Sequence, residues 1–173
     1  MKVVFNSNND KVSDCVEFIN DLFEIEMFYD SISNRKEPFT HTEYPPNRIS
    51  SILKSDNSKI TIKLYKSKNP FTKSNAYVSP KYKNTLFLNT RKLWREKPEI
   101  IDTIVHECVH VADYSENGQI DFGHGDNYSE GKENSAPYWI GNRAKQFYLD
   151  SLKSDIEIEQ HDIDESLIVD DKG

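Results

Sequence analysis

The chain has 173 residues and a mass of 20.1 kDa, enough for one domain with its own hydrophobic core. A net charge of −7 and a pI near 5.3 argue against a broad nucleic-acid or membrane footprint. No apolar run approaches the roughly 18 residues of a membrane-spanning helix, and residues 1–11 lack the apolar region of a secretory signal. Cys15 and Cys108 form no disulfide framework. We therefore expect a cytoplasmic protein, which another machinery could still deliver elsewhere.

The first third of the chain predicts a strand, a helix and a loop. Residues 2–6 (KVVFN) are typical of a short strand. Apolar residues recur at near-helical spacing over 13–32, behind a favourable cap at Ser13. The segment 33–48 is rich in turn-forming residues, and two consecutive prolines near its end are expected to keep it out of regular structure.

Two further strands are predicted in the middle of the chain. Residues 59–67 alternate apolar and polar side chains, and 84–90 form a short apolar segment bounded by asparagines. The segment 69–83 between them predicts a loop or one arm of a hairpin. Lysine and arginine clearly outnumber acidic residues from Lys54 to Arg95, which makes this part locally basic inside an acidic chain.

The last part of the chain predicts two helices separated by a long glycine-rich loop. A helix is expected over 98–114, a loop over 115–135 and a second helix over 136–155. Together the elements predict an α+β fold, with a small mixed or antiparallel sheet packed on the first of these helices and further helices on either side. We expect one domain over 1–153, followed by an acidic, flexible tail over 154–173.

The helix over 98–114 carries the H-E-x-x-H pattern, in the stretch TIVHECVHVADY. Residues four apart on a helix lie about 40° apart around its axis, so His106 and His110 can direct both imidazoles at one metal ion. Glu107 flanks that face, where a carboxylate can take a proton from a metal-bound water. Cys108 lies on the opposite side of the helix and is expected in the core. The pattern predicts a Zn²⁺ site with Glu107 as general base.

Two residues compete to be the third protein ligand. His124 follows fourteen residues after the second motif histidine, between glycines that allow a sharp backbone turn toward a metal. Glu133 lies at the start of the following helix, which can pack antiparallel to the motif helix. Asp113, Asp126 and Glu130 are weaker candidates. The residues alone leave His124 and Glu133 as equal alternatives.

The chain resembles two groups of known families, and the two resemblances imply different third ligands. HECVH followed by FGHG resembles the SprT-like metallopeptidases, in which a histidine-glycine pair after the motif supplies the third ligand; this implies His124. Residues 131–144 (GKENSAPYWIGNRA) are instead similar to the glutamate-bearing helix of gluzincin-like effector and toxin peptidases and of small phage-encoded zincin-like proteins. That similarity implies Glu133 as the ligand and Asn142 as a residue supporting the ligands. The resemblance covers roughly 84–147.

Both resemblances imply a zincin-like zinc metallopeptidase, which hydrolyses peptide bonds with a zinc-activated water and Glu107 as general base. An endopeptidase acting on a protein or peptide substrate is expected. The strand before the motif helix commonly borders the substrate cleft in this class, so a peptide is expected to pair with strand 84–89. Stabilising the oxyanion requires a second donor, and the candidates are Tyr128, Tyr138, Arg143 and, where it is not a ligand, His124.

A different class of function is also compatible with the motif. A zinc-stabilised binding, structural or virion-associated protein would keep the metal without turnover, and a closed shell of His106, His110, His124 and Glu133 would indicate it. A DNA-associated protease has little support, because the chain is acidic and has no basic tail or zinc knuckle. The lysines around strand 84–89 allow two interpretations, a solvated face or a preference for acidic substrates.

Overall fold

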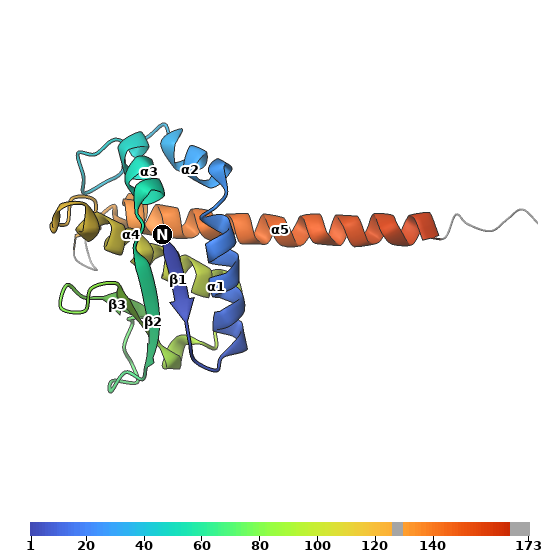
Figure 1. The fold of residues 1–173 in the computed structure, drawn as a ribbon, viewed down its shortest axis with the longest axis horizontal. Helices are drawn as coiled ribbons and strands as arrows, with labels where there is room; N and C mark the ends of the chain where they lie inside the picture. Colours follow the sequence, from blue (N-terminus) through green and yellow to red (C-terminus); the bar gives the residue numbers. More distant parts are fainter. Residues whose placement is uncertain (126–129, 167–173) are drawn as a thin grey trace, which may run out of the picture.

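The computed structural model describes residues 1–125 and 130–166, and the side chains of 1–125 and 130–154. They form one α+β domain in which a four-stranded mixed sheet is combined with five helices (Figure 1). In chain order the elements are β1 (Lys2–Phe5), α1 (Asp10–Leu22), α2 (Glu26–Ser33), α3 (Pro46–Ser55), β2 (Lys59–Tyr65), β3 (Ala76–Val78), β4 (Thr85–Asn89), the 3₁₀ turn η1 (Thr90–Lys92), α4 (Lys97–Asn117), the 3₁₀ turn η2 (Lys132–Asn134) and α5 (Ala136–Ser166). No helix in this described part is long and apolar enough to cross a membrane.

The sheet has the strand order β1-β2-β4-β3. β1, β2 and β4 run parallel, and β3 runs antiparallel to β4 at the edge of the sheet. Because side chains alternate along a strand, Ile60 and Ile62 of β2 and Leu86 and Leu88 of β4 share the buried face, each with at most 2% of its surface exposed. The core therefore lies on one side of the sheet, where α1 and α4 pack.

α4 is the central helix, and it contacts the sheet, α1, α3 and α5. It ends at Gly118, which adopts a left-handed conformation at φ 78°. α5 lies along α4 and then runs on beyond the rest of the domain (Figure 1). The two helices approach closely at Gly141, because a Cβ atom there would lie 2.4 Å from Asp102 Oδ1 and 2.7 Å from Asp102 O.

The predicted helix over 13–32 is wrong in detail, because two helices occupy this stretch. α1 begins at Asp10, since the side chain of Asn9 accepts a hydrogen bond from the Val12 N–H at 3.0 Å and caps the first turn. α1 ends at Leu22, and the Tyr29 hydroxyl of α2 donates to the freed Phe23 carbonyl at 3.0 Å.

Two other boundaries differ from the sequence prediction. α3 begins at Pro46 inside the predicted loop, because proline at the first helical position has no N–H to leave unsatisfied and a φ suited to a helix. The helix expected over 136–155 continues to Ser166 as α5, so part of the predicted tail 154–173 is helical. Residues 167–173 lie outside the described part of the chain.

The segment 69–83 contains β3 and is a hairpin arm, one of its two predicted alternatives. β3 pairs with β4 in the register Ala76 with Leu88 and Val78 with Leu86. β4 is therefore hydrogen-bonded on both sides, by β2 and by β3. Its backbone is not open to a peptide, and the strand edge next to α4 belongs to β3 rather than to strand 84–89.

Candidate metal centre

α4 presents His106 and His110 on one face, with their ring centroids 5.0 Å apart. Helical spacing alone brings these two side chains together, as the sequence predicts. Cys108 lies on the other side of the helix, fully buried in the core, where burial raises the pKa of its thiol. The prediction that Cys108 is a core residue rather than a ligand is confirmed.

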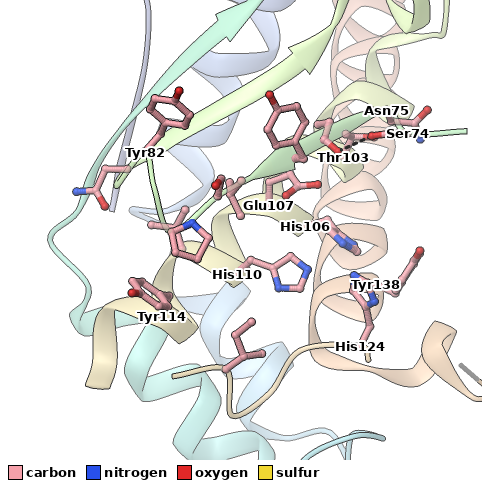
Figure 2. A pocket seen from close by; sticks show the side chains of 18 of the residues that line it. Ser74, Asn75, Tyr82, Thr103, His106, Glu107, His110, Tyr114, His124 and Tyr138 are labelled. Carbon is pink, nitrogen blue, oxygen red and sulfur yellow. Dashed lines mark hydrogen bonds between the residues drawn. The ribbon is translucent and has the colours of Figure 1, made fainter. Parts of the chain in front are cut away.

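His124 joins these two histidines from the loop after α4 (Figure 2). One ring nitrogen from each of the three histidines lies within 4.8 Å of the others, and the three can hold a metal ion. The His124 ring centroid is 5.3 Å from that of His106 and 4.9 Å from that of His110. A three-histidine set is a common ligand set for zinc and suits other transition metals as well.

Asp113 holds the loop that carries His124. This side chain is fully buried on α4, three residues beyond His110, and accepts hydrogen bonds from two backbone N–H groups. The Asp121 N–H donates to Oδ1 at 2.8 Å, and the Phe122 N–H donates to Oδ2 at 3.0 Å. Burial raises the pKa of Asp113 to about 6. Asp113, which the sequence predicts as a weaker ligand candidate, thus anchors the loop and is not part of the three-histidine group.

Two further features shape the same loop. The Asp121 carboxylate accepts hydrogen bonds at Oδ2 from the Asn117 side-chain amide at 2.6 Å and from the Tyr44 hydroxyl at 3.2 Å. A Cβ atom on Gly123 would lie 2.7 Å from a side-chain carbon of the exposed Ile120, so any larger residue would require that side chain to move. The loop is therefore fixed by contacts just before His124.

Burial makes the two helix histidines weak bases. The pKa of His110 is lowered to about 4, first by burial and then by the neighbouring His124. The pKa of His106 is lowered well below its ordinary value by burial and by the other two histidines. Both imidazoles are neutral at pH 7, which is the form that binds a metal ion.

Glu107 lies between the two helix histidines in sequence and lines the same cavity. Only 8% of its surface is exposed, and burial raises its pKa to about 7, although a backbone hydrogen bond from Val78 lowers it in part. A carboxylate with a pKa near neutrality can both take up and release a proton at pH 7. Val78 belongs to β3, so the edge strand contacts the candidate base directly.

The three histidines and Glu107 line a cavity of about 1150 Å³ between α4 and the β3 arm (Figure 2). Residues 73–80 and 82–84 form one wall, and α4 forms the opposite wall. Tyr138, near the start of α5, lines the cavity edge-on to His106, with its ring centroid 4.6 Å from that histidine and 5.2 Å from His124. The cavity is large enough for a segment of peptide.

The structure does not bring the other predicted ligand to this group. Glu133 lies on η2 with an exposed side chain and is not among the residues that surround the cavity. Asn142 is exposed on α5, so it does not support the histidines as the resemblance implies. Of the two predicted candidates for the third ligand, His124 is the one that the structure groups with His106 and His110 among the residues it describes.

The remaining candidates lie apart from the cavity or outside the described residues. Arg143 packs over the Phe147 ring at 5.0 Å and does not line the cavity. Glu130 is exposed, and its backbone carbonyl lies 3.0 Å from His41 Nε2. Asp126 and Tyr128 belong to 126–129, which lie outside the described residues. Of the predicted oxyanion donors, Tyr138 and His124 therefore line the cavity.

Sequence reasoning missed Asp102, which also lines the cavity. It lies one turn before His106, and burial and the nearby Glu99 raise its pKa to about 6. The four-residue spacing from His106 places it on the ligand face of the helix, and that spacing was a usable signal. The sequence contains no comparable indication that β3 lines the cavity. This strand has three residues, and it is formed by pairing with β4.

Comparisons with protein-family models, with curated proteins and with solved structures each gave no match to this chain. What is established is an α+β domain with a three-histidine group that can hold a metal ion.

Proposed function

We propose that this protein is a zinc-dependent metallopeptidase that binds its substrate in the cavity between α4 and β3. The observation that carries the proposal is the convergence of three histidines and the buried carboxylate of Glu107 on one cavity. The H-E-x-x-H spacing and its resemblance to zincin-like peptidases support the same conclusion. Three protein ligands leave one tetrahedral position open, as hydrolytic zinc sites require.

The chain's own residues divide the chemistry between them. Zinc, when bound, would supply Lewis acidity and lower the pKa of a water molecule. Glu107, which is buried beside the histidines, would accept a proton from the attacking water and pass it to the leaving amine. The Tyr138 ring lies against those of two histidines and lines the cavity, so Tyr138 is our candidate to stabilise developing negative charge.

The edge strand β3 is the proposed place for the peptide backbone. One side of β3 pairs with β4, and its residues Ala76, Tyr77 and Val78 line the cavity next to Glu107. A peptide added as a further strand would pass over the histidines and bring its carbonyl groups to them. This placement replaces strand 84–89, whose backbone is already paired on both sides.

Metal content and peptide hydrolysis test the proposal together. The purified protein should bind one zinc ion per chain, and Glu107→Gln should retain the metal while hydrolysis falls by several orders of magnitude. His124→Ala should weaken zinc binding strongly, whereas Glu133→Gln should leave it unchanged because Glu133 is exposed on η2. A parent protein that binds zinc but cleaves no peptide would instead favour the metal-stabilised binding protein.

A further inference from the structure

The wall of the cavity opposite α4 is strongly basic. We call residues 66–84, which contain β3 and its flanking loops, the basic arm; it carries five lysines and no acidic residue. Lys73 and Lys83 of this arm line the cavity, and both are exposed. The carboxylates that line the cavity among the described residues are those of Asp102 and Glu107, both on α4. The two walls therefore differ in charge, and the arm presents positive charge to the cavity.

The lysines of the basic arm have no acidic partner within the described part of the chain. The ion pairs found there use Lys54, Lys97, Lys145 and Lys153, all outside the arm. The arm nevertheless belongs to a chain whose net charge is −7. Local positive charge that is not neutralised within the chain is available to attract a negatively charged ligand.

The geometry favours an acidic polypeptide over a nucleic acid as that ligand. β3 offers a strand edge beside the cavity, and backbone pairing along such an edge is specific to polypeptides. Binding of single-stranded nucleic acid relies on aromatic ring faces that are open to bases. Tyr77 and Phe87, which are neighbours on β3 and β4, stack on each other, with their centroids 4.9 Å apart and an interplanar angle of 14°. Tyr82 lines the cavity but lies edge-on to Phe87, and Phe71, which is 89% exposed, does not line the cavity.

The two lysines lie on either side of β3 in the chain. Lys73 comes three residues before Ala76, where β3 begins, and Lys83 comes five residues after Val78, where β3 ends; both line the cavity. Resting on the peptidase function proposed above, we propose that the cavity selects peptides with acidic residues on both sides of the bond to be cleaved. Lys73 pairs with a carboxylate on one side and Lys83 with a carboxylate on the other, while β3 holds the backbone between them.

A panel of matched peptides tests this selection. Each peptide has the same neutral centre, flanked on either side by glutamate, glutamine or lysine. The parent protein should cleave the peptide with glutamate on both sides roughly tenfold more efficiently, in kcat/KM, than the glutamine peptide, and this preference should shrink as salt is added. Lys73→Glu and Lys83→Glu should each remove the preference on one side only.

A matched control separates the cavity from general surface charge. The double variant Lys73→Glu/Lys83→Glu should reverse the preference toward lysine-flanked peptides. Lys59→Glu/Lys63→Glu makes the same change in net charge on exposed β2 residues that do not line the cavity, and it should leave the preference unchanged. Equal effects of the two double variants would overturn the proposal.

Binding to Glu107→Gln distinguishes failure of this inference from failure of the peptidase function. If the parent cleaves all peptides equally, the function stands and the charge selection is refuted. If the parent cleaves none, but Glu107→Gln loaded with zinc binds glutamate-flanked peptides more tightly through Lys73 and Lys83, the selection stands without the peptidase. Loss of affinity for a single-stranded DNA oligonucleotide in the cavity double variant, with unchanged peptide preference, would assign the lysines to nucleic acid and overturn the proposal.

Discussion

Replacing Asp113 with asparagine should separate the stability of the fold from the assembly of the metal centre. Asp113→Asn keeps the shape of the side chain but leaves one acceptor oxygen for the two N–H groups of Asp121 and Phe122. Losing that acceptor costs about 1–3 kcal/mol. The neutral amide also removes the cost of burying a charge, which a rise in pKa from 3.8 to about 6 puts at about 3 kcal/mol.

These two contributions oppose each other, so the free energy of unfolding near pH 7 should rise by between about 0 and 2 kcal/mol. The loop that carries His124, however, loses one of its two anchors. Zinc affinity should therefore fall by roughly 10- to 100-fold, as it does when groups that orient metal ligands are replaced. Competition with a chelator measures the affinity, and urea unfolding of the metal-free protein measures the stability.

The pH dependence of stability provides a second test of the role of Asp113 in the same variant. The pKa of Asp113 is higher in the folded than in the unfolded chain, so the folded state binds more protons between about pH 4 and 6. Its contribution is present below the unfolded pKa and is lost as pH rises through about 6. The stability difference between the parent and Asp113→Asn should therefore change over this range. Unaltered zinc affinity in Asp113→Asn would show that Asp113 does not position His124.

Three further predictions address the histidines, the base and the helix contact. In the metal-free protein, the ring resonances of His110 should titrate near pH 4 by NMR, compared with about 6.5 in the urea-unfolded chain, and a native value near 6.5 would contradict the burial argument. In the metal-free protein, the carboxyl group of Glu107 should titrate near pH 7 by NMR, compared with about 4.5 in the unfolded chain, and zinc should lower this pKa because a nearby cation favours the carboxylate; a metal-free value near 4.5 would show that the side chain is solvated. Gly141→Ala should cost about 1–3 kcal/mol in unfolding experiments, because its Cβ would collide with the carboxylate and carbonyl of Asp102, and an unchanged stability would show that the helices can separate freely.

The parts of the fold that were predictable from sequence depend on local patterns. The strands β2 and β4 follow from alternation and from short apolar segments, and α4 follows from its proline start and apolar spacing. The errors arose where one residue decides a boundary. Pro46 opens a helix instead of blocking one, and the turn after Leu22 divides a continuous helical pattern because the Phe23 carbonyl finds a partner in Tyr29. Such choices depend on contacts made across the chain.

The same distinction applies to the site. His106, Glu107 and His110 share one helix, so their spacing in sequence fixes their spacing in space. The third position depends on the path of a loop, for which the sequence offered a histidine and a glutamate on equal terms. The path is set by Asp113, which is fully buried on the same helix and binds the loop backbone two residues before His124. A carboxylate in an H-E-x-x-H helix can thus contribute to a metal centre without touching the metal, by determining which later residue arrives there.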